Sequence, residues 1–526
     1  MLSRYARTAL GALALLAAPL AHAQNGQLDP TFSGDGVAFG PLNGGVAYDV
    51  AVDEQKGPVI VGSYRTTQTA TDAFIARYNP DGTLDSQFNG DGFATRDFGG
   101  SDEALVEAAV DGNGFYVAAG FSDGRALVVR YLDDGRLDPA FGTGGIALFS
   151  AGGAAGEREV ALTVAVGPGG VLYVGGVSGA AGGRRGFVAR FTAAGVLDPT
   201  FGVGGVVRLP LAGSAVDSVA PTGDGRLVLT GSLNQNGNQD ILVARLLASG
   251  LLDTTFSADG LLAVDAFGNE DRGAKILAGG DGALTIVGTG GSSQQSRVLA
   301  LSLGYGGDPT VGYGTNGVVL VDASPEDAAG FDTGYDAAVD RDGRLVIAGT
   351  TFFRVGTGAS QSSAVLIRLL PTGVRDTAFG TNGLVRTPVG TIGAYFGVAV
   401  DRHDAIYAAG EGSTGTAGVW VVARYTSGRT VAGEVGSEAA TAAFEGARPN
   451  PLAATTALRY RLAAAAEVTL TVHDVLGREV ARLAEGAQAA GAHEVRWDAS
   501  AVAPGVYVAR LQSGASIQTV RLTVAR

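Results

Sequence analysis

The chain has 526 residues, of which 46% are hydrophobic and 17% are charged, and this composition excludes an intrinsically disordered protein. It contains no cysteine, which excludes disulfides, thiolate metal sites and a cysteine nucleophile. The formal net charge is −14, and residues 24–442 hold 26 Lys and Arg against 44 Asp and Glu. Because nucleic-acid binding needs clustered positive charge, we expect no nucleic-acid partner.

The first residues have the pattern of a secretory signal peptide. Arg4 and Arg7 precede an apolar run at 9–20, and the small residues Ala21 and Ala23 flank His22 at a cleavage site. We predict a signal peptide over 1–23 and a mature chain that begins at Gln24. The alternative is a membrane anchor, but the run is shorter than the ~20 residues that span a bilayer, and we expect no transmembrane segment in the mature chain.

A motif that begins as "LDPTFSGDG" at Leu28 recurs along the chain. Its Leu-Asp pair returns at 84–85, 137–138, 197–198 and 252–253, and in altered form at 307–308 and 375–376, with a mean period of about 58 residues. Each interval contains four apolar runs of strand length, as in "AYDVAVD", "PVIVGSY", "DAFIARY" and "GFATRDF". This pattern predicts a seven-bladed β-propeller over 24–428, with a linear β-solenoid as the alternative.

The two ends of the repeat region predict how such a ring closes. The first copy begins with an additional strand at 37–39, and the last copy ends at 419–428 without an outer strand. We therefore expect the N-terminal strand to complete the last blade.

An arginine stands eight residues before the motif aspartate in most copies, which predicts an ion pair across a tight turn. The expected pairs are Arg77–Asp85, Arg130–Asp138, Arg190–Asp198, Arg245–Asp253 and Arg368–Asp376, with Arg424–Asp29 joining the two ends of the ring. The fifth copy has Leu301 where an arginine is expected, so Asp308 should be less well paired. We interpret the set as structural, since chemistry rarely needs seven equivalent sites.

The LDxxFG motif, the GxxG turns and the "ARY" strand over residues 28–425 resemble the delta-60 repeat of exported bacterial proteins. The resemblance implies an exported β-propeller and does not imply a biochemical activity.

The composition changes after Tyr425. Residues 429–446 are rich in Gly, Ala, Ser and Thr and are interpreted as a linker, and residues 447–526 alternate in hydropathy as a small immunoglobulin-like β-sandwich does. This tail resembles the type A C-terminal sorting domain of type IX secretion. The matching residues are Pro449, Asn450, Pro451, Asp474, Gly477, Arg478, Trp497, Gly505 and Tyr507. Arg448 departs from the aromatic residue that often precedes the Pro-Asn-Pro motif.

The second resemblance implies a route of export and two partners. These are the outer-membrane type IX translocon and its sorting protease, which would act on residues 447–526 and leave the protein secreted or at the cell surface. The alternative is that the sandwich is a permanent adhesion module.

The sequence assigns no catalytic, cofactor-binding or metal-binding residue, and an enzyme is not the favoured class. His403 is the one histidine in the mature repeat region and is interpreted as a solvated turn residue. Calcium is the only cofactor with a faint motif, at 110–114 and 339–343, and both segments lack the full ligand spacing of a calcium loop and are interpreted as β-turns.

Variable polar loops give the functional hypothesis. The loops that join second to third strands (64–72, 233–240, 291–297 and 353–364) and those that enter inner strands (99–104, 268–273 and 323–332) should share one face. We therefore expect a propeller that binds an extracellular ligand there. The first alternative is a secreted hydrolase or lyase acting on polysaccharide, which requires acidic residues of different blades to converge with raised pKa values. The second alternative is a structural surface or adhesion protein.

Overall fold

The computed structural model describes residues 25–525 except 68–69, 154–155, 181–182, 269, 328, 355–359, 415–416, 429–441, 449, 451, 463–464, 475–477 and 514–515. The chain divides into two compact units, Met1–Arg429 and Thr430–Arg526. The predicted signal peptide and most of the predicted linker lie outside the described residues. Among the described residues, no helix has both the length and the apolar character needed to cross a membrane.

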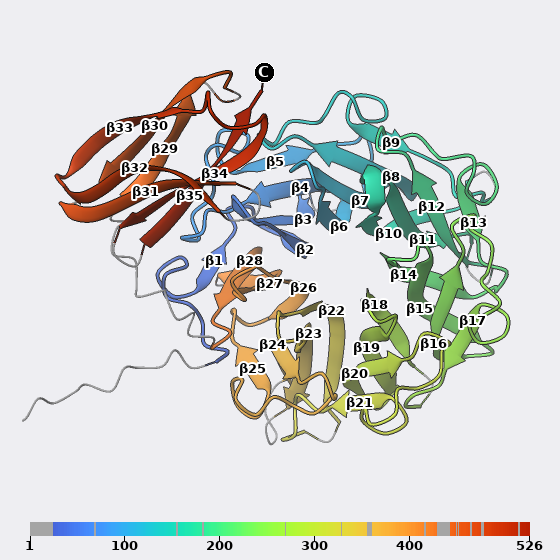
Figure 1. Cartoon of the computed structure of the whole chain (residues 1–526). Coiled ribbons are helices and arrows are strands. Elements are labelled where there is room, and N and C mark those ends of the chain that lie inside the picture. The colour runs from blue at the N-terminus through green and yellow to red at the C-terminus, as the bar shows by residue number, and fades with distance from the viewer. Residues whose placement is uncertain are drawn as a thin grey trace, which may run out of the picture. The chain divides into compact units, whose positions relative to one another are not determined.

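Unit 1 is built from four-stranded antiparallel sheets, here called blades and numbered along the chain. Their inner strands face a common centre in Figure 1. Blades 1 to 3 are β2–β5 (Val46–Asp53, Gly57–Arg65, Thr71–Arg77, Phe93–Arg96), β6–β9 (Glu103–Val110, Tyr116–Ser122, Arg125–Tyr131, Ile146–Leu148) and β10–β13 (Glu159–Val166, Leu172–Ser178, Arg185–Phe191, Val206–Arg208). A 3-10 turn, Pro168–Gly170, precedes β11.

The later blades repeat this order. Blades 4 to 6 are β14–β17 (Ser214–Pro221, Leu227–Gln235, Asn238–Leu246, Leu261–Val264), β18–β21 (Arg272–Ala278, Leu284–Ser292, Gln295–Leu303, Val318–Val321) and β22–β25 (Phe331–Val339, Leu345–Arg354, Ser360–Leu369, Leu384–Thr387). Blade 7 contains β26–β28 (Ala394–Val400, Ile406–Thr414, Ala417–Tyr425) and takes its fourth strand from the start of the chain. A single parallel bridge, Ser296 to Phe331, links blades 5 and 6.

That fourth strand is β1, Val37–Phe39, which pairs antiparallel with β28 at the outer edge of blade 7. Val37 lies opposite Ala423 and Phe39 lies opposite Val421, and Figure 1 shows the two strands side by side. The described part of unit 1 therefore joins its first and last strands in one sheet, as the unpaired strands at the two ends of the repeat region predict.

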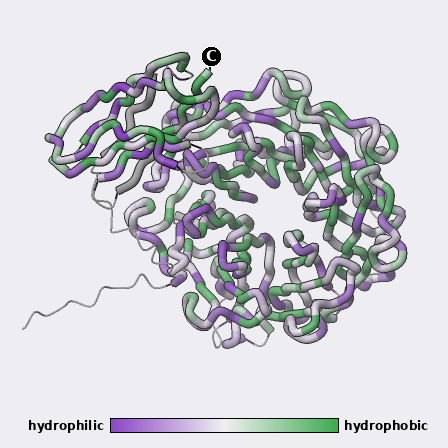
Figure 2. The backbone as a smooth tube through the Cα atoms, viewed as in Figure 1, coloured by the Kyte–Doolittle hydropathy of each residue, from purple (hydrophilic) through white to green (hydrophobic). Residues whose placement is uncertain are grey.

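The hydrophobic cores of unit 1 lie between neighbouring blades. One cluster contains Val59 and Val61 of blade 1 with Leu105 and Tyr116 of blade 2. Another contains Phe74 of blade 1 with the fully buried Trp420 of blade 7, and the two rings stack with centroids 4.2 Å apart. Figure 2 shows the hydrophobic residues concentrated along the strands. The middle strands of a blade, such as β3 and β4, are buried on both faces because each blade has a neighbour on either side.

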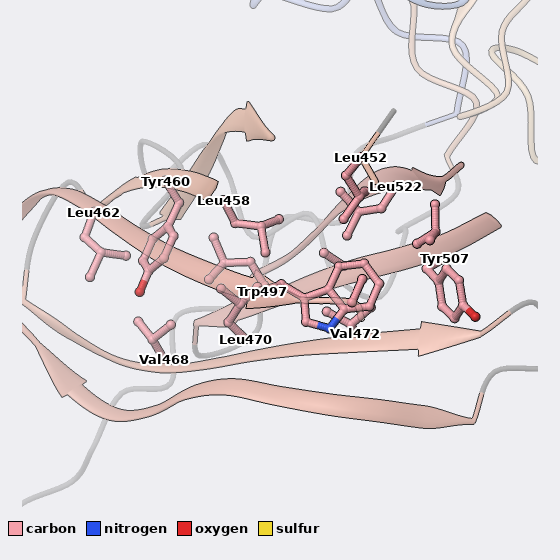
Figure 3. Close-up of a cluster of buried hydrophobic side chains, with 14 residues drawn as sticks. Leu452, Leu458, Tyr460, Leu462, Val468, Leu470, Val472, Trp497, Tyr507 and Leu522 are labelled. Atoms are coloured by element: carbon pink, nitrogen blue, oxygen red, sulfur yellow. The ribbon is translucent and has the colours of Figure 1, made fainter. Parts of the chain in front are cut away.

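Unit 2 is a β-sandwich of two sheets. One sheet has the order β29, β30, β33 (Ala442–Arg448, Thr455–Leu462, Gly491–Asp498), and the other has the order β32, β31, β34, β35 (Glu479–Gln488, Ala466–Asp474, Gly505–Ser513, Ser516–Val524). Its core contains Trp497, whose ring meets Tyr507 edge to face at 5.4 Å (Figure 3). An all-β chain with a propeller followed by a small sandwich is therefore confirmed.

The residues of the predicted sorting motif have different surroundings. Trp497 is buried, the Tyr507 hydroxyl donates to the Ala503 carbonyl at 2.8 Å, and the Asn450 side chain accepts from the Thr523 N–H at 2.8 Å. Arg478 is exposed, and Gly505 begins β34. Pro449, Pro451, Gly477 and the side chain of Asp474 lie outside the described residues.

Candidate functional site

The motif aspartates and the arginines before them form ion pairs across the turn that follows the third strand of a blade. The arginine–aspartate N–O distances are 2.7 Å for Arg77–Asp85, 2.6 Å for Arg130–Asp138, 2.9 Å for Arg190–Asp198, 2.8 Å for Arg245–Asp253, 2.8 Å for Arg368–Asp376 and 2.8 Å for Arg424–Asp29. In each pair the arginine Nε donates to the carboxylate, and for Arg245 this contact is the N–O distance given above. Both groups are mostly buried, so the pairing offsets their desolvation.

Each of these arginines also joins its own blade to the next one. Arg77 of blade 1 donates from Nη1 to the Asp133 carbonyl of blade 2 at 2.5 Å, and its guanidinium lies over the Phe88 ring at 5.0 Å from the centroid. Arg424 of blade 7 likewise donates to the Pro80 carbonyl of blade 1 and covers Phe32. One side chain thus binds the motif aspartate, the motif phenylalanine and the neighbouring blade, which explains why the motif repeats.

A motif glycine allows the close approach that this turn needs. Gly92 has φ +94°, and a Cβ there would lie 2.5 Å from Cβ of Leu84. A bulkier residue would be strained by the backbone conformation and would also clash.

Blade 5 departs from this arrangement at different residues from those predicted. The strand pairing Leu284–Leu303 corresponds to Leu227–Leu246 in blade 4, so Ser302 occupies the place of Arg245. Thr310 then occupies the place of the motif aspartate, and Ser302 donates to its hydroxyl at 2.9 Å. The prediction that Leu301 and Asp308 occupy the arginine and aspartate positions of blade 5 is wrong. The pairing of the strands, and not the Gly-Asp dipeptide, determines which residues of blades 4 and 5 are equivalent. The motif aspartate is accordingly replaced by threonine in this blade.

Every inner strand carries one β-bulge at the same level. The strand register shifts by one residue at the same place in β2, β6, β10, β14, β18, β22 and β26. The residues that the shifts leave unpaired are Tyr48, Val106, Leu162, Asp217, Ala274, Tyr335 and Phe396. All of them line one cavity of about 410 Å³, and we call them the collar. The bulges therefore turn one side chain of each blade toward the cavity.

The residue after each bulge belongs to a second ring, which we call the belt. Its members are Asp49, Glu107, Thr163, Ser218, Lys275, Asp336 and Gly397. Several belt side chains accept a hydrogen bond from a backbone N–H of the next blade. Asp49 accepts from Ala108 at 2.9 Å, Glu107 from Val164 at 3.0 Å and Asp336 from Val398 at 2.8 Å. These contacts fix the carboxylates in place.

The belt brings charges of distant blades together. The Lys275 Nζ of blade 5 lies 2.5 Å from Oε1 of Glu107 in blade 2 and 3.1 Å from Oδ1 of Asp336 in blade 6. These three residues and Asp49 also line the cavity. The chain contains only two lysines, so a lysine at this place is distinctive.

Burial strongly perturbs this cluster. The pKa of Asp49 rises to about 8, first because burial removes the carboxylate from water and second because the Asp336 carboxylate repels it. Burial also raises the pKa of Asp336, against the opposing effect of Lys275. The pKa of Lys275 lies well above its usual value, because the attraction of Asp336, Glu107 and Asp49 outweighs desolvation, so the ammonium stays charged. Carboxyl groups of different blades thus converge with raised pKa values.

Polar loops extend the cavity on one side. Arg272 forms a bidentate pair with Asp217, with N–O distances of 2.5 and 3.1 Å, and both residues also line a groove of about 730 Å³. Asn234, Gln235, Asn236 and Gln239 of the predicted loop 233–240 line that groove. This loop also meets a loop that enters an inner strand, through a bridge between Gln239 and Glu270. The two loop sets therefore share a face at this place.

Acidic residues in the loops that enter inner strands have structural partners. Glu103 accepts from the N–H groups of Phe98 and Gly100, and the fully buried Asp271 accepts from Ala266, Phe267 and Gly291. These carboxylates fold their loops, so their presence in the sequence is no indication of ligand binding.

The faint metal motifs form turns. Asp111 accepts from the N–H groups of Asn113 and Phe115, and Asp340 pairs with Arg344 at 2.6 Å. His403 is exposed in its turn and accepts from Arg402 at 3.0 Å. In the described part of the chain, no group of three or more His, Asp or Glu has an arrangement that could hold a metal ion.

Sequence reasoning missed the belt. Asp49, Glu107 and Asp336 stand inside apolar runs, in "YDVAVD", "VEAAVD" and "YDAAVD", at the same place in the repeat. A carboxylate at the equivalent position of three related apolar strands, together with the rare Lys275, is the signal that could have found the site.

Comparison with known proteins agrees with the fold. Residues 57–88, 168–201, 222–256 and 341–379 match the family described as "Domain of unknown function (DUF5122) beta-propeller", and residues 452–516 match the FlgD Ig-like domain. A search of curated protein sequences finds no match to this chain.

Solved structures with a similar arrangement are remote. A fungal alcohol oxidase of the AA5 family in complex with copper is 13% identical, with a TM-score of 0.40 over 95% of this chain and 100% of that chain. Drosophila Semaphorin 2a is 9% identical, with a TM-score of 0.41 over 95% and 99%. PorZ, a surface component of the type-IX secretion system of Porphyromonas gingivalis, is 14% identical, with a TM-score of 0.30 over 89% and 68%. At these TM-scores the similarities give no information about function. The family matches show that the chain contains DUF5122 β-propeller repeats followed by a FlgD-type Ig-like domain.

Proposed function

We propose that the protein is exported and that its propeller binds an extracellular ligand in the cavity at the collar. The observation that carries this proposal is the contribution of every inner strand to one cavity through an equivalent bulge. Ligand sites are typically preformed cavities of this size, with apolar walls and a few fixed polar groups. The collar supplies the walls, and the belt supplies polar groups that backbone hydrogen bonds hold in place.

The groove beside the cavity supports binding of a ligand with more than one residue or sugar unit. Asp217 and Arg272 are shared by the cavity and the groove, so a chain leaving the cavity would continue along Asn234 and Gln239. Side-chain amides are suited to hydrogen bonding with hydroxyl and amide groups of such a chain.

For export, we propose the type IX route. The signal-peptide pattern of residues 1–23 supports passage across the inner membrane, and the motif of residues 447–526 supports recognition by the outer-membrane translocon and its sorting protease. The Ig-like fold of residues 452–516 is compatible with this role. The protein would then be secreted or displayed at the cell surface.

One observation favours a second candidate, a hydrolase or lyase acting on polysaccharide. Asp49 has a pKa of about 8 and is therefore a carboxylic acid that keeps its proton near neutral pH, as a general acid must. Glu107 and Asp336 are further carboxyl groups in the same cavity.

A combined binding and turnover screen tests both candidates. The purified full-length protein is applied to polysaccharides and cell-envelope fractions, with and without calcium, and hydrolysis is measured in the same wells. Saturable binding without turnover, weakened by Asn234→Ala and Gln239→Ala, supports the binding protein. Turnover that Asp49→Asn abolishes supports the enzyme. Absence of both binding and turnover contradicts both candidates and favours the structural surface protein.

A further inference from the structure

The charges around the cavity do not balance. Its described lining contains the four carboxyl groups of Asp49, Glu107, Asp217 and Asp336 against the two cations Arg272 and Lys275. Arg272 is paired with Asp217, and Lys275 is shared by Glu107 and Asp336. Asp49 has no ion pair among these contacts, and it accepts a hydrogen bond from the backbone N–H of Ala108. With all four carboxyl groups ionised, which for Asp49 requires a pH above its pKa of about 8, the cavity has an excess of two negative charges.

Aromatic rings line the same cavity as these carboxylates. Phe396 of the collar lies between Tyr48 and Tyr335, with ring centroids 6.1 and 4.9 Å from theirs. The three rings come from β2, β22 and β26, which also carry the belt residues Asp49, Asp336 and Gly397. Aromatic faces attract cations, and they cover the carbon groups attached to a cationic nitrogen.

The belt position of blade 7 is a glycine, Gly397, so this blade has no belt side chain. A Cβ on Gly397 would lie 2.6 Å from Cα and 2.8 Å from Oδ1 of Asp49. Glycine therefore allows blade 7 to approach Asp49 closely, with Phe396 directly before it in the sequence.

We propose that the cavity binds an organic ammonium group, with the cationic nitrogen at Asp49 and its carbon substituents against Tyr48, Tyr335 and Phe396. This inference rests on the proposed binding function and names the chemistry of the ligand. The overall charge of residues 24–442, with 44 acidic and 26 basic residues, favours the approach of cationic ligands. The ammonium can belong to a small molecule or to a lysine side chain of a peptide.

Choline and its uncharged carbon isostere 3,3-dimethylbutan-1-ol provide the direct comparison. The two molecules have nearly the same shape and differ in the charge of one atom. Calorimetric titration of the full-length protein at about pH 9, where Asp49 is mostly ionised, should show choline binding about tenfold more tightly than the isostere. Equal affinity for the two probes, or absence of saturable choline binding, overturns the inference.

Two matched variants, titrated at the same pH, show whether the choline cation lies at Asp49. Asp49→Asn keeps an oxygen for the Ala108 N–H and removes the charge, so choline affinity should fall about tenfold while binding of the isostere is unchanged. Asp91→Asn removes an exposed carboxylate that accepts from Phe93 in an outer turn, and it should change neither affinity. If both variants bind choline as the wild type does, the cation is not at Asp49 and the inference fails.

The pH dependence gives an independent readout. Choline has a permanent charge, so any change in its affinity with pH reports the protein. Asp49 is faced by Glu107 of β6, Lys275 of β18 and Asp336 of β22, and its pKa of about 8 means that it ionises between about pH 7 and pH 9. Affinity should rise from about pH 6 to about pH 9 in the wild type and stay level in Asp49→Asn. A level wild-type profile contradicts the placement at Asp49.

Competition experiments show whether a lysine side chain can supply the ammonium group. They also distinguish binding of any ligand in the cavity from binding of a cation. If an acetylated lysine peptide fails to displace choline while the same peptide with free lysine succeeds, a lysine side chain is an accepted source. If the wider screen recovers a neutral or anionic ligand that Ala274→Trp excludes and choline does not displace, binding in the cavity stands and the ammonium inference is wrong.

Discussion

The guanidinium of Arg424 lies 2.8 Å from the carboxylate of Asp29, although the two residues are 395 positions apart. The pair occupies the same place in blade 7 that Arg77 and Asp85 occupy in blade 1. It therefore holds the first motif of the chain against the last blade, next to the pairing of β1 with β28.

Replacement of Arg424 by alanine should destabilise unit 1 by about 2 kcal/mol, because Asp29 then keeps a partly buried charge without its partner. Thermal unfolding of the full-length protein measures this loss. Arg402→Ala is the matched control, since Arg402 lies 3.8 Å from Glu54 and its side chain is 55% exposed. The control should change stability by less than about 0.5 kcal/mol. Equal effects of the two substitutions would mean that the ring-closing pair has no special role.

In blade 5 the missing arginine–aspartate pair can be introduced by substitution. Ser302→Arg alone places an unpaired charge in a buried position and should destabilise the protein by about 2 kcal/mol. Adding Thr310→Asp should restore most of this loss, because the new pair reproduces Arg245 and Asp253 of blade 4. A double-mutant cycle by chemical denaturation measures the coupling, which should exceed about 1 kcal/mol. Additive effects would contradict the assignment of Ser302 and Thr310 as the equivalent positions.

The belt should make stability depend on pH. The pKa of Asp49 is raised from 3.8 to about 8 in the folded state, so the folded protein holds its proton more tightly than the unfolded chain does. The contribution of this proton is present below about pH 4 and is lost as the pH rises toward about 8. Asp49→Asn lacks this proton, so its free energy of unfolding relative to the wild type should increase across that interval. A constant difference between the two proteins would show that the carboxyl titrates normally.

Removal of unit 2 should separate export from folding. In the described chain, the hydrophobic cluster of unit 2 shares no residue with the clusters between blades, so a chain that ends at residue 428 should keep a folded propeller. In a bacterium with a type IX secretion system, this truncated chain should accumulate in the periplasm while the full chain reaches the medium or the cell surface. Fractionation with detection by antibody measures the distribution. Normal export of the truncated chain would refute the sorting role of residues 447–526.

The sequence predicts those features that local spacing determines. The pair Arg77–Asp85 could be predicted because eight residues across a tight turn bring the two side chains together, and the same spacing recurs. Blade 5 was misassigned because its arginine is missing, and only the pairing of Leu284 with Leu303 shows that Ser302 takes its place.

The belt depends on relationships that spacing does not show. Glu107 and Lys275 are 168 residues apart and meet only because blades 2 and 5 face each other across the cavity. The bulge before each belt residue also shifts the alternation of the strand by one, so a strict two-residue period does not predict which side chains line the cavity.

A single pair of substitutions tests whether the ligand binds in the cavity at the collar. Ala274→Trp places a large ring in the collar, and Ala194→Trp places the same ring in an exposed outer turn as a control. The affinity of the full-length protein for the ligand recovered from the envelope screen is measured for both variants and the wild type. We predict that Ala274→Trp abolishes binding and that Ala194→Trp leaves it unchanged. Wild-type affinity in a folded Ala274→Trp protein would contradict the account, because the ligand would then bind elsewhere.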